Sequence, residues 1–168
     1  EKLFNAIATQ FACQSSLNLI DRSGEMAVVS LDTVHYTGLA ETVENTFQDA
    51  SKVRELNHKI LGHLRDALRK CGLDPKTVPL QPTGDGALVY LPTLQQAVSF
   101  AQGVLDREHL LNHHREQQWR HWTRIGIAVG PVCLEVVTDF DGSVVAVDAG
   151  GCAIIEAVRL QTICWVGG

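Results

Sequence analysis

Two aspartates stand where an apolar segment should give way to a tight loop. Asp32 closes the apolar segment 26–31, and Asp85 lies within Gly84-Asp85-Gly86, between two further apolar runs. Carboxylate oxygens suit Mg²⁺ and Mn²⁺, and a magnesium ion that keeps several waters needs only one or two protein carboxylates when substrate phosphates supply further ligands. The pair therefore points to metal-dependent chemistry on a nucleotide.

A plainer interpretation of the two aspartates stays open at this point. Two carboxylates at one sheet edge could hold two cations about 3.5–4 Å apart, which suits an in-line phosphoryl transfer. However, an Asp-Gly step is favoured at a hairpin tip by turn geometry alone, and an aspartate after a strand is often a turn former or a helix cap. Residue type and spacing do not decide between the two.

The apolar pattern predicts an α+β domain around these residues. Leu3, Ile7 and Phe11 have helical spacing and predict a lead-in helix within residues 1–25, before a first core strand over 26–31. A three-to-four-residue apolar repeat predicts one long amphipathic helix over 41–70. The other expected elements are a hairpin of strands 78–83 and 87–91, a helix from residue 94, strands over 124–132, 134–137 and 144–147, and a helix over 151–161. This order predicts a sheet covered by helices on one face.

Composition narrows the class of protein. The chain has 168 residues, with 45% hydrophobic and 20% charged residues, and its net charge of −5 argues against a general nucleic-acid surface. No apolar run approaches the ~20 residues that span a bilayer. Five cysteines without a C-x-x-C pair, and no signal-peptide pattern, favour reduced thiols and a cytoplasmic location. We expect a lead-in segment over 1–25 and one main domain over 26–168, whose C-terminal part could be missing.

Four segments, in this order, carry a family resemblance. They are LDTVHYTGL, TGDGALVYL, TRIGIAVGPV and DAGGCAIIEAVRLQ, and together they cover about residues 27–162. They resemble the two metal motifs of class III nucleotidyl cyclases, the strand whose leading arginine contacts the triphosphate, and the segment whose helix ends in a catalytic arginine. The resemblance implies a ferredoxin-like core, with an antiparallel-rich sheet and helices packed on it.

The resemblance also implies roles for particular residues. Two divalent cations, Mg²⁺ or Mn²⁺, would bind a nucleoside triphosphate in a homodimer whose active sites lie at the subunit interface, with two arginines reaching one substrate from different subunits. The metal ligands would be Asp32, Asp85 and the carbonyl of Thr33. The phosphates would be held by the backbone amides of Val34, His35, Tyr36 and Thr37. Arg124 would pair with the triphosphate, and Arg159 would stabilise charge at the α-phosphate. From the residues alone, Arg124 could equally flank a surface strand, and Arg159 could complement a helix dipole.

Several positions depart from the family pattern. Gln81 stands where purine-specific members carry an adenine-reading lysine, whereas the partner aspartate is retained as Asp148. A glutamine side chain donates and accepts, so adenine, guanine and a pyrimidine all stay open. Ile155 replaces a ribose-binding asparagine, and His35 replaces a glycine in the phosphate turn. These departures resemble the bacterial cyclases of antiviral signalling, some of which make cyclic pyrimidine nucleotides.

The sequence thus leads to a ranked set of functions. The first is a cyclase that converts a nucleoside triphosphate to a 3′,5′-cyclic nucleotide and pyrophosphate. The alternative is a non-catalytic cyclase-homology domain that binds a nucleotide or dimerises for regulation, and a third class is a ferredoxin-like interaction module. The histidines His109, His113, His114 and His121 lack the supporting spacing of a zinc site, and we expect Trp119 and Trp122 to pack against the sheet or a partner.

Overall fold

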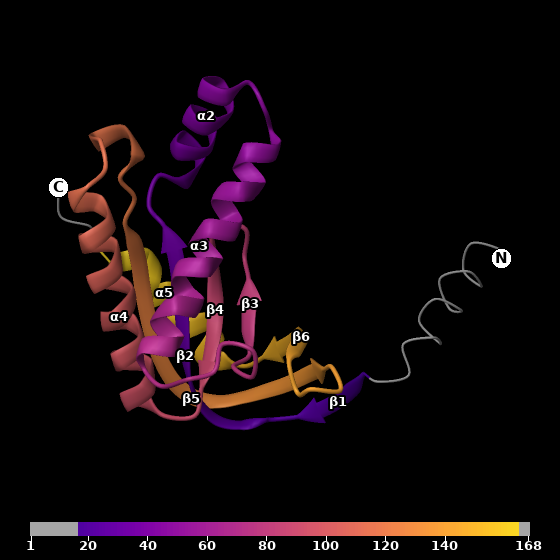
Figure 1. Ribbon diagram of the computed structural model, residues 1–168. Helices are drawn as coiled ribbons and strands as arrows, with labels where there is room; N and C mark the ends of the chain where they lie inside the picture. Colours follow the sequence, from indigo (N-terminus) through magenta and orange to yellow (C-terminus); the bar gives the residue numbers. More distant parts are fainter. Residues whose placement is uncertain (1–16, 165–168) are drawn as a thin grey trace, which may run out of the picture.

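The computed structural model describes residues 17–164 as strands and helices that follow one another around a curled sheet (Figure 1). No helix within these residues is both long enough and apolar enough to cross a membrane. In chain order the elements are β1 (Asn18–Asp21), β2 (Gly24–Thr33), α2 (Tyr36–Phe47), α3 (Ser51–Lys70), β3 (Leu80–Pro82), β4 (Gly86–Leu91), α4 (Leu94–His113), the short 3₁₀ helix η1 (Gln117–Trp119), β5 (Thr123–Thr138), β6 (Val144–Gly150) and α5 (Cys152–Ile163).

The strands pair antiparallel throughout, in the order β1-β5-β2-β4-β3, with β6 also paired to β5. The long strand β5 connects two halves of the sheet. Its first part, Thr123 to Val132, pairs with β2, and its second part, Cys133 to Thr138, pairs with β6. In Figure 1 the second part bends away together with β1 and β6. The predicted antiparallel-rich α+β fold is confirmed, although the two strands expected over 124–137 are one continuous strand.

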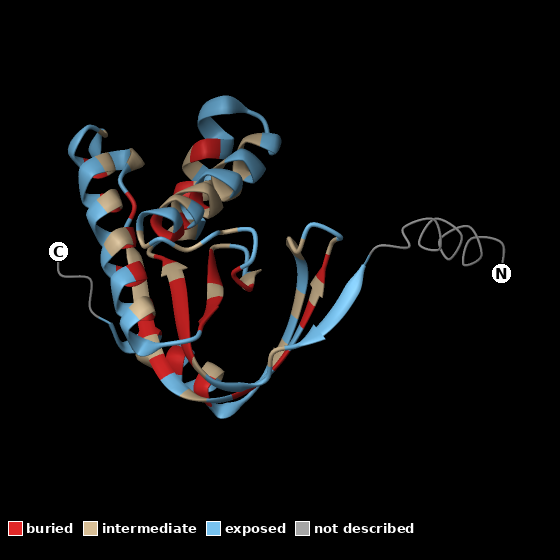
Figure 2. Cartoon of the chain, turned by 60° about the horizontal axis from the view of Figure 1, so that its bottom comes forward, coloured by how far each residue is buried: buried red, intermediate tan, exposed pale blue. Residues whose placement is uncertain are grey.

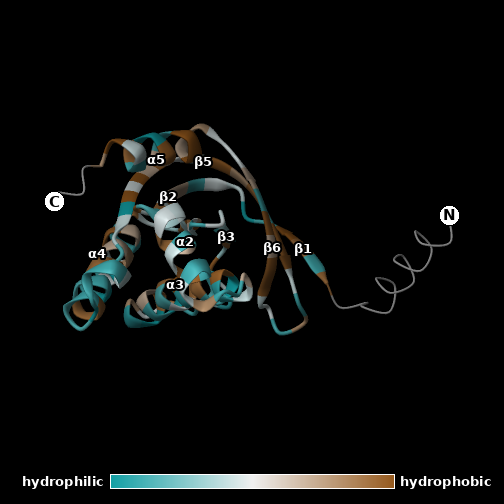
Figure 3. Ribbon diagram, turned by 90° about the horizontal axis from the view of Figure 1, so that it is seen from above, coloured by the Kyte–Doolittle hydropathy of each residue, from teal (hydrophilic) through white to brown (hydrophobic). Residues whose placement is uncertain are grey.

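Helices cover both faces of the sheet, so the prediction of helices on one face was wrong. Ala27, Val29 and Leu31 of β2 belong to a core shared with α3 and α4. Val28, between them, belongs to a second core that contains Ala153 and Ala157 of α5. Successive strand residues point to opposite faces, and β2 is apolar at both sets of positions, which is typical of a strand buried on both sides. Figures 2 and 3 show the buried β2 and the helices on either side.

The N-terminal prediction is wrong in the part that the structure describes. Residues 18–21 form the strand β1, which pairs with Glu135 to Thr138 of β5, and β2 already begins at Gly24. The helical spacing of Leu3, Ile7 and Phe11 lies outside the described residues. A helix over residues 18–21 is excluded, because the end of β5 extends past β2 and these residues pair with it as β1.

The long helix predicted over 41–70 is two helices. Gln48 has a left-handed backbone (φ 51°) and ends α2, and α3 starts at Ser51. The apolar repeat continues across the break because both helices bury apolar residues, Leu39 and Val43 in α2 and Ile60 and Leu64 in α3. The repeat therefore predicts part of the buried face, since Phe47 and Ala50 at the break are exposed, and it does not predict the turn.

The segment between α4 and β5 is tied down by buried polar groups. Asn112 donates to the backbone oxygen of His121 at 2.6 Å, and its own oxygen accepts from the His121 amide at 3.3 Å. The buried carboxylate of Glu108 accepts from the amide of Thr123 at 2.9 Å and also binds its hydroxyl. These contacts hold the start of β5 against α4.

His121 should make the stability of the domain depend on pH. Burial, together with the neighbouring Arg115 and His63, lowers the pKa of His121 to about 4. A lowered folded-state pKa gives stability that is present above the ordinary value of 6.5 and is lost as the pH falls toward 4. Between pH 7 and pH 5 we expect His121 to account for a loss of about 2 kcal/mol.

Urea unfolding at the two pH values measures this effect. The variant His121→Gln, which does not titrate, should lose about 2 kcal/mol less than the wild type between pH 7 and pH 5. His58→Gln, at an exposed histidine of α3, is the matched control and should keep the wild-type difference. Equal pH dependence of the wild type and His121→Gln would contradict the prediction.

Candidate active site

The two aspartates singled out in the sequence lie together at one end of the sheet. Asp32 is the penultimate residue of β2, where it is paired with Gly86 on β4 and with Arg124 on β5. The neighbouring Thr33 amide donates to the backbone oxygen of Asp85 at 3.0 Å, which fixes the hairpin tip against the end of β2. The carboxyl of Asp85 lies close enough to that of Asp32 for the two groups to interact, and this interaction contributes to a raised pKa of Asp85. Two residues 53 positions apart therefore share one site.

The contact between these carboxyls has an electrostatic cost. Partial burial and the contact with Asp32 raise the pKa of Asp85, and Arg124 opposes that rise. Two carboxylates this close disfavour each other's ionisation unless a cation lies between or beside them. Among residues 17–164 no group of three His, Cys, Asp or Glu side chains gathers as a metal site. A cation held here would therefore need further ligands from the backbone, water or a substrate.

Arg124 is part of the same cluster. Its guanidinium donates from Nε to Oδ2 of Asp32 at 3.0 Å and makes a second contact with the same oxygen through a terminal nitrogen. The two residues are direct partners in the register of β2 and β5. The predicted triphosphate arginine thus lies next to the predicted metal ligand, and binding of both a metal and a triphosphate would require this ion pair to rearrange.

The predicted phosphate turn connects β2 to α2. His35 has a left-handed backbone (φ 56°), the conformation that the glycine of the family pattern would adopt easily, and histidine tolerates it better than most residues. The Val34 amide already donates to the backbone oxygen of Trp122 at 2.8 Å, so its predicted role toward phosphate does not fit this arrangement. Tyr36 and Thr37 open α2, and first-turn amides have no acceptor within their own helix. The tyrosine hydroxyl binds Asn57.

A third group of polar residues brings the two predicted base-reading positions together. Gln81 lies on β3 and Asp148 on β6, and the hydroxyl of Tyr90 on β4 donates to Oε1 of Gln81 at 3.0 Å. Burial and the charge of Asp148 raise the pKa of Tyr90 to about 12. Sequence reasoning missed Tyr90. Its signal was a single hydroxyl in an otherwise apolar strand, GALVYL, which reads as core packing.

The last two predicted residues lie apart from this cluster. Arg159 and Ile155 are exposed on α5, one helical turn apart, and the isoleucine side chain is 53% exposed. Val158 and Ile163 of the same helix are also exposed. Because Ala153 and Ala157 face the sheet, this row of side chains points outward. Among residues 17–164, Arg159 forms no ion pair with Asp32 or Asp85.

Comparison with known proteins gives matches among solved structures. No protein-family model matches the chain, and no curated protein does. The adenylate/guanylate cyclase/hydrolase from Silicibacter pomeroyi is 26% identical, with a TM-score of 0.57 over 84% of this chain and 71% of that one. The adenylyl cyclase CyaB from P. aeruginosa is 19% identical, with a TM-score of 0.61 over 85% and 74%.

A bacterial light-regulated adenylyl cyclase is 16% identical, with a TM-score of 0.63 over 96% of this chain. The chain spans about half (51%) of that longer protein. The structural neighbours are thus catalytic domains of adenylate and guanylate cyclases, and the mixed α+β fold with its curled antiparallel sheet matches theirs.

Proposed function

We propose that this chain is a nucleotidyl cyclase domain that converts a nucleoside triphosphate to a 3′,5′-cyclic nucleotide and pyrophosphate. In this reaction the 3′-oxygen forms a bond to the α-phosphorus, the bond from that phosphorus to the β-phosphate oxygen breaks, and the 3′-hydroxyl proton is released. One observation carries the proposal: Asp32 and Asp85 share a site beside Arg124 on a cyclase fold. We place the reaction in the cytoplasm.

The residues present fit divalent cations. Two carboxyls in contact at a partly exposed site attract positive charge, and oxygen ligands suit Mg²⁺ or Mn²⁺. Asp32, Asp85 and the carbonyl of Thr33 would hold the two cations, whose charge would lower the pKa of the 3′-hydroxyl and stabilise the transferring phosphoryl group. Arg124 would leave Asp32 and bind the triphosphate, and the first-turn amides of Tyr36 and Thr37 would donate to its oxygens.

A direct assay tests the reaction. The protein is incubated with Mn²⁺ and, separately, with each of the four ribonucleoside triphosphates, and mass spectrometry detects cyclic product and pyrophosphate. We expect cyclic product from at least one substrate. If none of the four is cyclised, while Mn²⁺-dependent nucleotide binding persists, the regulatory alternative replaces the proposal.

Two observations favour that alternative, a cyclase-homology domain without turnover. Ile155 cannot hydrogen-bond a ribose, and Arg124 holds Asp32 in an ion pair. In that case calorimetry would detect nucleotide binding that is unchanged in Asp85→Ala. A chain that binds no nucleotide with or without Mn²⁺ would be neither enzyme nor nucleotide sensor.

We further propose that the active unit is a homodimer in which Arg159 serves the partner's aspartates. Arg159 lies on an outward face with exposed apolar neighbours, the arrangement expected of a helix that meets a second subunit. Asp32→Asn and Arg159→Ala should each be inactive alone. Mixed and re-equilibrated at equal concentration, they should recover about a quarter of the wild-type activity, because half of the dimers carry one intact site of two.

Specific activity of the mixture is the measurement. Asp32→Asn mixed with Asp85→Asn is the matched control. This mixture should recover no activity, because every subunit in it carries a damaged aspartate pair. Recovery in the control, or none in the test mixture, would contradict the shared site.

We expect Tyr90 to increase the selectivity of the site among the four nucleotide bases. Its hydroxyl donates to Oε1 of Gln81, so the amide NH₂ of Gln81 remains free to donate to a base. The carboxylate of Asp148 would accept a hydrogen bond from the same base. One donor and one acceptor can match a purine or a pyrimidine edge, so cyclic pyrimidine products of the antiviral kind are among those that the assay tests. In Tyr90→Phe the amide of Gln81 can flip, and we expect the kcat/KM ratio of the best to the second substrate to fall about fivefold to tenfold.

The four-substrate assay on Tyr90→Phe measures this ratio, and its unfolding free energy should change by only about 1 kcal/mol. An unchanged ratio would show that Gln81 does not read the base.

A further inference from the structure

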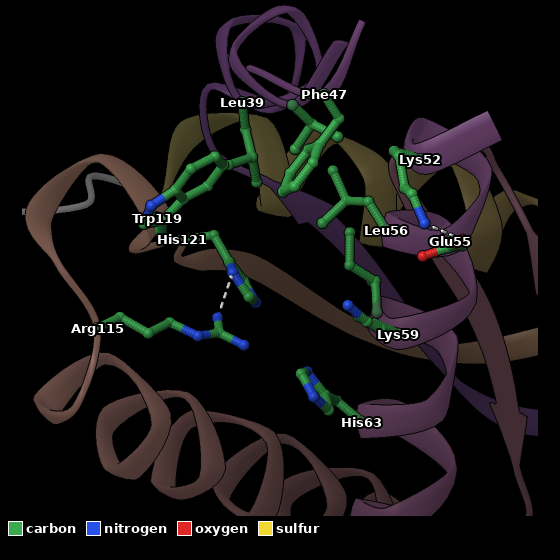
Figure 4. Close-up of a pocket in the computed structure, with 12 residues that line it drawn as sticks. Leu39, Phe47, Lys52, Glu55, Leu56, Lys59, His63, Arg115, Trp119 and His121 are labelled. Carbon is green, nitrogen blue, oxygen red and sulfur yellow. Dashed lines mark hydrogen bonds and ion pairs between the residues drawn. The ribbon is translucent and has the colours of Figure 1, made fainter. Parts of the chain in front are cut away.

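A cavity that none of the aspartate-site residues lines is found between α2, α3 and the segment that joins α4 to β5 (Figure 4). Its volume is about 430 Å³, within the usual range of small-molecule sites. The residues that line it are Leu39, Val43, Phe47, Lys52, Glu55, Leu56, Lys59, Ile60, His63, Arg115, Trp119 and His121. None of them belongs to the proposed cyclase site.

The cavity has two chemically different ends. In Figure 4, Leu39, Phe47, Leu56 and Trp119 gather at one end, and Arg115, Lys59 and the histidines lie at the other. The rings of Phe47 and Trp119 have centroids 6.4 Å apart at an angle of 39°. Phe47 is 55% exposed, which is unusual for a side chain that large. A flat apolar group placed here would cover both rings.

The polar end carries net positive charge. Glu55 and Lys52 neutralise each other through an ion pair of 2.8 Å. His121, with its pKa lowered to about 4, is neutral near pH 7, so its Nδ1 accepts from the Arg115 guanidinium at 2.8 Å. Arg115 and Lys59 remain as cations, and the charge of Arg115 is partly balanced by Glu108 on α4. A ligand with one negative charge would balance the remaining positive charge at this end of the cavity.

A buried nitrogen without a partner lies in the same place. Nδ1 of His63 is buried and has no hydrogen-bond partner among the described residues. Its ring is stacked on that of His121, with centroids 6.1 Å apart and an interplanar angle of 7°. Burial lowers the pKa of His63 too, so both imidazole rings are neutral near pH 7, and each keeps one N–H donor and one acceptor nitrogen. An unpaired buried polar atom normally costs free energy, and an oxygen-bearing ligand would relieve that cost.

We propose that this cavity binds a small organic monoanion, an aromatic carboxylate, with its ring against Phe47 and Trp119 and its carboxylate toward Arg115, Lys59 and the two histidines. A phosphate dianion fits less well, because Arg115 already shares its charge with Glu108. A neutral apolar molecule would leave the cationic end unsatisfied.

The cavity is also connected to the predicted phosphate turn. Leu39 and Val43 lie on α2, which starts at Tyr36, and His121 lies three residues before Arg124. The Val34 amide donates to the oxygen of Trp122, the residue after His121. An occupant would therefore contact both segments that lead to the aspartate site.

Isothermal calorimetry with indole-3-acetate tests binding without any turnover, so its result is independent of the cyclase assay. We expect a Kd below about 1 mM for the wild type. The uncharged indole-3-acetamide, which has the same ring, should bind at least about tenfold more weakly, because it lacks the charge that faces Arg115.

Variants separate the site from general adsorption. Arg115→Gln and Lys59→Gln should each weaken indole-3-acetate at least about fivefold. Lys59 is exposed, so its replacement does not threaten folding if Arg115→Gln proves unstable. Arg69→Gln, at an arginine of α3 paired with Asp66 outside the cavity, should bind as the wild type does. No binding up to several times that concentration, equal affinity for acid and amide, or wild-type affinity in Lys59→Gln would overturn the proposal.

Discussion

Replacing Asp32 by asparagine should lower kcat for cyclic nucleotide formation by about a thousandfold or more. The change keeps the shape of the side chain but removes the charge that would hold the divalent cations against the triphosphate. Metal ions of this kind supply several kcal/mol of charge stabilisation in the transition state, and each 1.36 kcal/mol corresponds to a factor of ten in rate. Steady-state rates with Mn²⁺ and the preferred triphosphate measure the loss.

Asp32 also pairs with Arg124, so a companion variant is needed to separate activity from folding. Burial and the interaction with the Asp32 carboxyl raise the pKa of Asp85, so its ionised side chain opposes folding near pH 7, and Asp85→Asn removes that ionised group. We therefore expect Asp85→Asn to be at least as stable as the wild type and yet equally inactive. Asp141→Asn, in an exposed turn, is the control that should keep full activity. Wild-type rates in either site variant would exclude the metal role.

Gly86→Ala should destabilise the domain by about 2–4 kcal/mol. A Cβ at Gly86 would lie 1.9 Å from the backbone oxygen of Leu31, 2.7 Å from its carbonyl carbon and 3.0 Å from the Cα of Asp32. All three atoms are backbone, so the only relief is to move β4 away from β2. That movement would carry Asp85, the preceding residue, away from Asp32, and we expect activity to fall with stability.

Urea unfolding of Gly86→Ala at neutral pH measures this loss. Gly62→Ala is the control, because that glycine lies within α3 and its added Cβ meets nothing within 4 Å. It should be neutral or more stable by up to about 1 kcal/mol, since alanine favours a helix. If Gly86→Ala were as stable as Gly62→Ala, the close approach of β4 to β2 would be wrong.

Local features of the fold could be predicted from residue order. The strand at 26–31, the Asp-Gly hairpin and the helix from Leu94 follow from patterns that span fewer than about twenty residues. The need for a glycine-like backbone at His35 was visible in the same way. The prediction of secondary structure was wrong where an apolar repeat continued across a turn, as at Gln48. It was also wrong where a segment pairs with a distant strand, as residues 18–21 pair with β5.

By itself, the sequence determined which residues are candidates for the chemistry, because acidic and basic side chains at strand ends are recognisable by type and position. Only the tertiary structure decided what each one meets. The register of β2 with β4 and β5 placed Asp32 beside Asp85 and Arg124, and the fold brought Tyr90 to Gln81 and within the electrostatic influence of Asp148. Such contacts join residues tens of positions apart, and they depend on strand pairing and burial across the whole sheet, which no local pattern encodes.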